Sequence, residues 1–120
     1  MINNLHDLTL ALRRFAAERD WDQFHSAKNL AMALSVEVAE LVEHFQWLTQ
    51  EQSLRLPPDT RRLVREEAAD VLIYLVRLAD RLDIDLLAAA EDKMARNAEK
   101  YPVALSRGHA GRPAPSEDLP

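Results

Sequence analysis

The sequence predicts an all-α fold, a four-helix antiparallel bundle. Apolar residues recur every three or four positions in four separate segments, which is the spacing of one face of a helix. No segment alternates apolar and polar residues with period two, so no sheet is expected. The connections between the four segments are short, and short connections favour antiparallel neighbours.

The first two helices are expected over residues 5–20 and 27–47. Asn3 or Asn4 can cap the first helix, and Ser26 can cap the second, because short polar side chains accept hydrogen bonds from the free N–H groups of a first turn. After the second helix, residues 49–52 read Thr-Gln-Glu-Gln, the spacing of a capping box. A short helical turn is therefore expected there.

The third and fourth helices are expected over residues 60–82 and 86–100. Pro57 and Pro58 interrupt the preceding chain, and Asp59 is the expected cap of the third helix. Residues 1–102 then make one helical domain. Residues 103–120 contain both glycines and three of the six prolines. They are expected to form a flexible tail, mobile or draped over a partner subunit.

The composition of the chain excludes several classes of protein and of functional site. A chain of 120 residues, 48% hydrophobic and 29% charged, is typical of one soluble domain. It shows no membrane-length apolar run and no signal-peptide pattern, so a cytoplasmic protein without a membrane partner is expected. The absence of cysteine excludes a thiolate nucleophile and a cysteine-based zinc site. A net charge of −5 argues against nucleic acid as a partner. With glycine only at positions 108 and 111, a Gly-rich phosphate loop is excluded.

Two pairs of acids occur in similar apolar surroundings, Glu37 with Glu40 and Glu67 with Asp70. Each pair is spaced by three, and apolar residues stand three and four positions before its first acid. Positions three and four apart share a helix face, so the acids lie in or beside the stripe that faces the core. Unpaired carboxylates are costly to bury. Two such pairs therefore predict a cation between them.

Oxygen ligands select hard cations, so the predicted metal is Mg²⁺ or Mn²⁺. Because Mg²⁺ keeps several waters, a substrate phosphate would complete its coordination. One acid pair alone is more often a solvated helix face, and the duplication is what favours a metal site. A di-iron carboxylate bundle is a weaker alternative, because neither pair forms the Glu-x-x-His motif of such sites.

Two further groups of residues suit a nucleotide. Lys93, Asn97 and Lys100 are spaced by four and three on the fourth helix, and Tyr101 follows. Such a cationic and amide face suits phosphate oxygens, although lysines at a helix end also favour the macrodipole.

Aromatic residues form the second group: Trp21, Phe24, His25 and Trp47. They suit a core or a surface that stacks on bases. His44 and Tyr74 fall one turn beyond Glu40 and Asp70, so either could border the acid site, or be an exposed and a core-edge residue.

Acids, tryptophans and a lysine–asparagine–tyrosine helix occur here in one order. Because these features follow one another in this order, the chain resembles the MazG-like all-α nucleoside triphosphate pyrophosphohydrolases, and within them the dCTP pyrophosphatase branch. The similarity runs from residue 15 to 103. It is carried by FAAERDW (15–21), FH (24–25), EVAEL (37–41), FQW (45–47), EEAADVLIYL (66–75) and KM…N…YP (93–102).

The resemblance implies specific roles for these residues. Glu37, Glu40, Glu67 and Asp70 would hold Mg²⁺ on the triphosphate. Phosphate or sugar contacts would come from Lys93, Asn97 and Tyr101, and the base pocket would be shaped by Trp21, Trp47 and Tyr74. His25 lies in a matching segment. Members of the family form dimers or tetramers with sites near subunit interfaces, so a homo-oligomer is implied.

The sequence departs from these relatives at two places. Leu12 stands where relatives can carry a pocket histidine, which puts strict cytosine selection in doubt. The Lys-Tyr-Thr-Glu-Leu type of ending seen in relatives is absent after Arg112.

The expected reaction is cleavage of a nucleoside triphosphate between its α and β phosphorus atoms, with deoxynucleotides such as dCTP preferred. Mg²⁺ would neutralise the phosphates and orient water, and Glu37 or Glu40 would act as base. Lys93 would offset charge on the pyrophosphate leaving group. The alternatives are a nucleotide sensor that leaves its ligand intact and a metal-stabilised helical interaction module.

Overall fold

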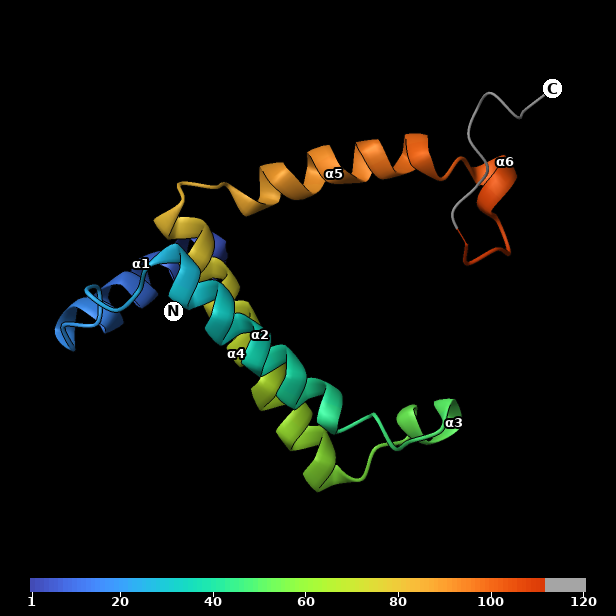
Figure 1. Ribbon diagram of the computed structural model, residues 1–120, viewed down its shortest axis with the longest axis horizontal. Helices are drawn as coiled ribbons and strands as arrows, with labels where there is room; N and C mark the ends of the chain where they lie inside the picture. The colour runs from blue at the N-terminus through green and yellow to red at the C-terminus, as the bar shows by residue number, and fades with distance from the viewer. Residues whose placement is uncertain (112–120) are drawn as a thin grey trace. The chain divides into compact units, whose positions relative to one another are not determined.

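The computed structural model describes residues 1–111, and in these residues every regular element is a helix (Figure 1). The predicted all-α class is therefore confirmed. The described chain forms two units, one over residues 1–84 and one beginning at Asp85. No described helix combines the length and the apolar character that a membrane span needs. The helices are α1 (Leu5–Glu18), α2 (Ala27–Glu43), α3 (Gln50–Ser53), α4 (Pro58–Arg81), α5 (Leu86–Lys100) and α6 (Val103–Ser106).

Helix α1 begins as predicted and ends two residues early. The Asn4 side chain accepts a hydrogen bond from the Asp7 N–H at 2.8 Å and caps the first turn. At the other end, Asp20 has φ +54°, in the left-handed region. The next N–H, of Trp21, then donates to the carbonyl of Ala16 at 2.9 Å. This left-handed residue ends the helix and brings Trp21 back against it.

Helix α2 starts at the predicted residue and is shorter than expected. Ser26 Oγ accepts the Asn29 N–H at 3.1 Å, so the predicted cap is confirmed. The helix ends at Glu43, and residues 44–48 form turns instead of another helical turn. The predicted capping box of α3 is also present: Thr49 Oγ1 accepts the Gln52 N–H at 3.1 Å, and Gln52 Oε1 accepts the Thr49 N–H at 3.0 Å.

Helix α4 corrects one prediction. Asp59 was expected to cap it, but Pro57 occupies the cap position and Pro58 is the first helical residue. Proline suits that position because its fixed φ is helical and its missing N–H would have no partner there. Asp59 instead lies in the first turn, where its carboxylate faces the positive end of the helix dipole.

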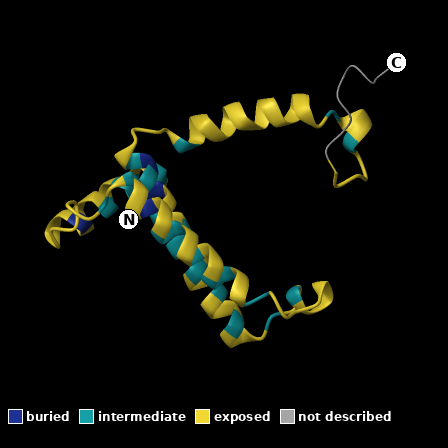
Figure 2. Cartoon of the chain, in the orientation of Figure 1, coloured by how far each residue is buried: buried dark blue, intermediate teal, exposed yellow. Residues whose placement is uncertain are grey.

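The first unit is built around α4, which runs antiparallel to α2 and also packs against α1 (Figure 1). The buried residues of α2 and α4 lie where these helices meet, and a further buried residue lies near the end of α1 (Figure 2). Three long helices, not four, therefore pack together in this unit. Among the described residues, the buried apolar positions are Ala16, Leu30, Val76 and Ala79.

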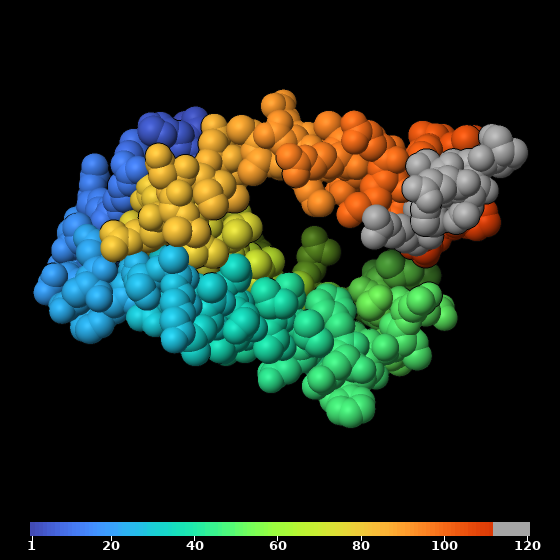
Figure 3. All heavy atoms as spheres, turned by 45° about the horizontal axis from the view of Figure 1, so that its top comes forward, coloured from blue at the N-terminus to red at the C-terminus, as the bar shows by residue number. Residues whose placement is uncertain are grey.

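The outer face of α2 is apolar, and the first unit leaves it exposed. This helix lies along the surface in the space-filling view, in cyan (Figure 3). Met32, Val36 and Val42 are 58%, 54% and 51% exposed. Exposed apolar side chains that gather on one helix are a candidate interface.

The second unit begins with α5, whose bounds are those predicted. Asp85 Oδ1 accepts the Ala88 N–H at 3.1 Å and caps it. Beyond α5, the one-turn helix α6 occupies part of the expected tail. The rest of that tail, residues 112–120, lies outside the described residues. The boundary predicted after residue 102 stays a prediction.

Candidate functional site

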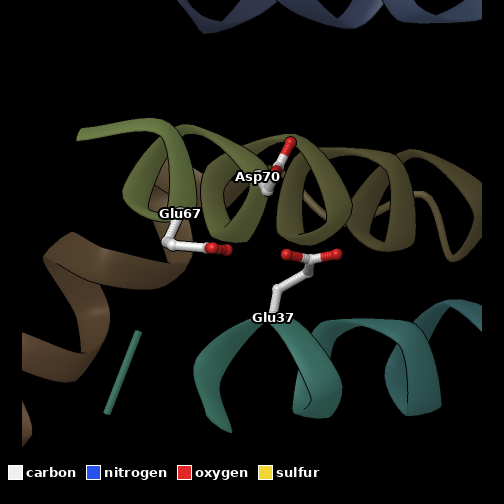
Figure 4. Close-up of side chains that lie close together, drawn as sticks. All are labelled: Glu37, Glu67 and Asp70. Atoms are coloured by element: carbon white, nitrogen blue, oxygen red, sulfur yellow. The ribbon is translucent and has the colours of Figure 1, made fainter. Parts of the chain in front are cut away.

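The antiparallel pairing of α2 and α4 brings the two predicted acid segments face to face. Glu37 projects from α2 toward Glu67 and Asp70 on α4 (Figure 4). One carboxylate oxygen from each of the three lies within 4.8 Å of the others. Three of the four predicted acids thus form one cluster from two helices, and Glu40 is not among the three whose oxygens meet.

Glu40 acts on the same cluster through its charge. Burial, followed by the charges of Glu40 and Asp70, raises the pKa of Glu37 to about 7. The pKa of Glu67 is also raised, by burial first and then by a side-chain hydrogen bond with Glu40 and the charge of Glu40. Like charges held this close oppose one another's ionisation.

The donors of this cluster fit a divalent cation. Glu37 Oε2 and Glu67 Oε2 are buried, and neither has a hydrogen-bond partner among the described residues. The nearest cationic candidate is His44, whose Nε2 lies 3.9 Å from Glu67 Oε1, too far for a hydrogen bond. Buried carboxylate oxygens without donors require a compensating charge, and oxygen-only ligands suit a hard metal ion.

An apolar cavity of about 300 Å³ adjoins the acid cluster. Three of the residues predicted to hold a substrate base or border the site, Trp21, His25 and Tyr74, line it together. The Trp21 ring lies 5.7 Å from Phe15 in an edge-to-face arrangement and 6.1 Å from the His25 ring, between centroids. The full lining is Leu12, Phe15, Ala16, Trp21, His25, Asp70, Ile73, Tyr74 and Arg77.

Asp70 belongs to both features, because it lies in the acid cluster and also lines the cavity. A flat apolar group in the cavity would therefore lie beside the charges that require a cation. Leu12 lines the cavity too, so the position where relatives can carry a histidine is apolar here.

Trp47 lies away from this cavity. Trp21 precedes the first residue of α2 and Trp47 follows its last, and 17 helical residues span about 25 Å. Trp47 is 87% exposed. One chain therefore does not place both tryptophans on one base, and the predicted role of Trp47 stays a prediction.

The predicted phosphate-binding residues lie in the second unit. Lys93 and Asn97 are on α5, and Tyr101 ends it, its N–H donating to the Asn97 carbonyl at 2.7 Å. Their spacing places Lys93 and Asn97 one turn apart on one face. Contact between these side chains and phosphate stays a prediction.

Sequence reasoning missed Arg77, which is only 5% exposed. Its guanidinium donates to His25 Nδ1 at 3.2 Å, to Asp80 Oδ2 at 3.3 Å and to Asp22 Oδ1. Arg13 binds the same Asp80 through two hydrogen bonds of 2.8 and 2.6 Å. The signal was present, because Arg77 is the one charged residue in the otherwise apolar stretch 71–79.

Comparisons with known proteins agree with this geometry. The MazG-like family profile matches residues 32–110. The chain is 50% identical over 108 residues to dCTP pyrophosphatase 1 of Mus musculus, and 47% identical over 105 residues to that of Homo sapiens. These matches take in 88% and 86% of this chain but only 64% and 62% of those relatives, so the chain spans less than two thirds of their length.

One solved structure is similar to this chain over nearly the whole length of the solved protein. It is the crystal structure of a pyrophosphatase from Archaeoglobus fulgidus, 40% identical, with a TM-score of 0.78. The similarity covers 85% of this chain and 95% of that one. With the family profile matching more than half of the sequence, these findings show that the chain belongs to the MazG-like family.

Proposed function

We propose that the protein is a pyrophosphohydrolase that cleaves a nucleoside triphosphate to the monophosphate and pyrophosphate. The observation that carries this proposal is the position of Asp70, shared by a cluster that requires a cation and a cavity that suits a base. A triphosphate with its metal and its base needs these two environments side by side. The names of the relatives, dCTP pyrophosphatase 1 and pyrophosphatase, support the same reaction.

Glu37, Glu40, Glu67 and Asp70 would hold Mg²⁺, or Mn²⁺ in its place. A bound divalent ion supplies charge neutralisation for the phosphates and orientation for the attacking water. Glu37 or Glu40 would accept the proton that this water loses. Proton transfer to a positioned carboxylate of this kind lowers the barrier to attack.

Lys93, Asn97 and Tyr101 are proposed to bind the phosphates or sugar. The ammonium of Lys93 would offset the charge that develops on the pyrophosphate leaving group. Trp21, His25 and Tyr74 would surround the base. The reaction then rests on positioning and electrostatics, as in other phosphoryl chemistry.

The active form is proposed to be a homodimer or tetramer. The exposed apolar face of α2 and the small buried core of the first unit support this assembly. A second copy covering α2 would complete the four-helix packing that one chain's first unit lacks. It would also allow Trp47 to reach the site of its neighbour. Light scattering that finds a fully active monomer would contradict this.

The proposed substrates are deoxynucleotides, dCTP-like first, because large flat rings line the cavity. Discrimination among bases should be looser than in a site with a full set of edge-reading groups, since Leu12 offers no hydrogen bond. Removal of excess or modified nucleotides in the cytoplasm is the proposed role.

The test is a product assay with dCTP, dTTP, dUTP, dATP and dGTP. Monophosphate and pyrophosphate in equal amounts are expected with Mg²⁺, and no turnover is expected after chelation. A diphosphate product, or undiminished turnover in excess chelator, would overturn the assignment. Tight binding of intact nucleotide without turnover would indicate the sensor instead, and neither binding nor turnover would leave an interaction module.

A further inference from the structure

The buried arginine Arg77 has an unusual partner in His25. An arginine N–H can only donate a hydrogen bond, because the guanidinium has no acceptor. The 3.2 Å contact from Arg77 Nε to His25 Nδ1 therefore requires Nδ1 to be unprotonated. In a neutral imidazole the proton must then be on Nε2.

The neutral state of His25 follows from the same surroundings. Burial and the positive charge of Arg77 lower the pKa of His25, and Arg81 acts in the same direction. Asp22 acts against them. The ring is therefore neutral at pH 7, with one donor and one acceptor nitrogen.

Arg77 is itself held firmly in place. Its guanidinium is paired with Asp22 and Asp80, and Asp80 is fixed in turn by the two hydrogen bonds from Arg13. Arg13 lowers the pKa of Asp80 by hydrogen bonding, so this carboxylate stays ionised. An orienting group is effective only when its own rotamer is fixed by packing and further hydrogen bonds.

The other nitrogen of His25 is available to a ligand. The ring lines the aromatic cavity beside Trp21, and among residues 1–111 no group accepts a hydrogen bond from Nε2. Leu12 and Ile73 line the same cavity and carry no acceptor, and the two lining residues that do, Asp70 and Tyr74, receive no hydrogen bond from Nε2.

We infer that Arg77 is a positioning residue that holds His25 in its Nε2–H form, so that the ring offers a fixed hydrogen-bond donor to an acceptor on the nucleobase edge. The inference rests on the proposed function for its ligand and on the Arg77–His25 contact for its geometry. A fixed donor that meets ring N3 discriminates between pyrimidines by ordinary base chemistry, whereas one that meets O2 would not. The ring N3 of cytosine accepts a hydrogen bond, whereas N3 of thymine or uracil carries a proton and donates. The arrangement favours cytosine.

The tautomer can be tested without any nucleotide. Two-bond ¹H–¹⁵N correlation spectra of the full-length protein distinguish Nε2–H from Nδ1–H for each histidine, and His25→Phe identifies the signal. We expect His25 to be Nε2–H in the wild type. In Arg77→Lys, which keeps a positive charge but loses the fork that reaches three partners, the two tautomers should mix. An Nδ1–H signal in the wild type would overturn the inference.

The role in selection is tested by a double-mutant cycle of Arg77→Lys and His25→Phe, assayed with dCTP and dTTP. Each single variant should raise KM for dCTP about tenfold with kcat little changed, the effect of one lost hydrogen bond. Preference for dCTP over dTTP should fall by a similar factor. Because Arg77 acts through His25, adding Arg77→Lys to His25→Phe should change KM no further. Arg62→Lys, at an exposed position of α4, is the matched control and should behave as wild type.

Independent, additive effects of the two variants would overturn the inference, because Arg77 would then act by another route. The two experiments also separate this inference from the proposed function. An Nδ1–H signal with normal turnover overturns the inference and leaves the function standing. An Nε2–H signal with no turnover of any nucleotide overturns the function and supports the assigned tautomer.

Discussion

Two clusters of charged side chains lie along α4, and they are built in opposite ways. Around Arg77, each buried charge has a partner: the guanidinium faces two carboxylates, and Asp80 faces two arginines. Around Glu37, carboxylates from two helices face one another, and two of their buried oxygens have no donor within residues 1–111. The first cluster is complete within the chain, whereas the second becomes neutral only when something else binds. Buried charges without partners therefore indicate the ligand site more reliably than the number of charges does.

The largest expected effect comes from removing charge at the unpaired cluster. Glu37→Gln, Glu40→Gln, Glu67→Gln and Asp70→Asn keep the shape of the side chain but remove a ligand charge. Turnover should fall by about a hundredfold or more, because loss of one preorganised electrostatic group has effects of that order. The metal-free fold should be retained or stabilised, since like-charge repulsion is relieved.

Steady-state rates and thermal unfolding without metal measure both effects. Glu66→Gln is the matched control, because Glu66 is adjacent in sequence but exposed. Retained activity in all four variants would leave the cluster with a structural role only.

The opposite outcome is expected at the paired cluster. Arg77→Met should lower the free energy of unfolding by about 1–3 kcal/mol, since Asp22 and His25 Nδ1 lose their donor while Asp80 keeps Arg13. Chemical denaturation measures this loss. Arg14→Met is a suitable control, because Arg14 is exposed and makes no ion pair within residues 1–111. Equal stability of the two variants would show that the network around Arg77 is not needed for folding.

The acid cluster should also make the metal-free protein sensitive to pH. The pKa of Glu37 is about 7 when folded, against an ordinary value of 4.5, so the folded state binds more protons between these values. Stability should therefore decrease as pH rises from about 4.5 to about 7. Unfolding temperatures across this range measure the slope, and Glu37→Gln should flatten it. A stability that rises through this window in wild type, and does so equally in Glu37→Gln, would contradict the burial of a charged cluster.

The smallest effect is expected at Trp47, which belongs to neither cluster. Trp47→Ala should raise KM about tenfold for all five deoxynucleotides, because stacking contributes about 1–3 kcal/mol per base and tolerates any sequence. Trp21→Ala provides the comparison within the cavity. If Trp47→Ala leaves every KM unchanged, Trp47 does not reach a bound base. A purine preference in the wild type would mean that the cavity has been misinterpreted.

The sequence predicted those parts of the structure that depend on local spacing. The acid pairs, the caps at Asn4 and Ser26 and the bounds of α5 follow from periodicity and from side chains within three residues of each other. The cluster at Glu37 could be predicted because two similar local patterns required a common cation. From sequence alone, the proline at the start of α4 indicates the end of the preceding helix. A proline that ends one helix and a proline that starts another give the same local signal.

The Arg77 network could not be predicted in the same way. Its partners Asp22 and His25 are 55 and 52 residues away along the chain, in a connection whose path depends on the left-handed Asp20. Periodicity indicates which face of a helix is buried but not which loop residue meets it. A lone charge in an apolar helix indicates that a partner exists, and only the tertiary structure identifies it.

The residues that follow α1 and α4 are positions where a substitution could raise the thermal stability of the protein. Asp20 and Asp83 each follow one of these helices with φ +54°, a conformation that glycine adopts freely and that other residues adopt at some energetic cost. In both places the next N–H returns to the helix, from Trp21 to Ala16 and from Ile84 to Ala79. Neither aspartate belongs to the acid cluster or lines the aromatic cavity. A lineage under heat could therefore substitute glycine at both positions and relieve this cost without altering the acid cluster or the aromatic cavity.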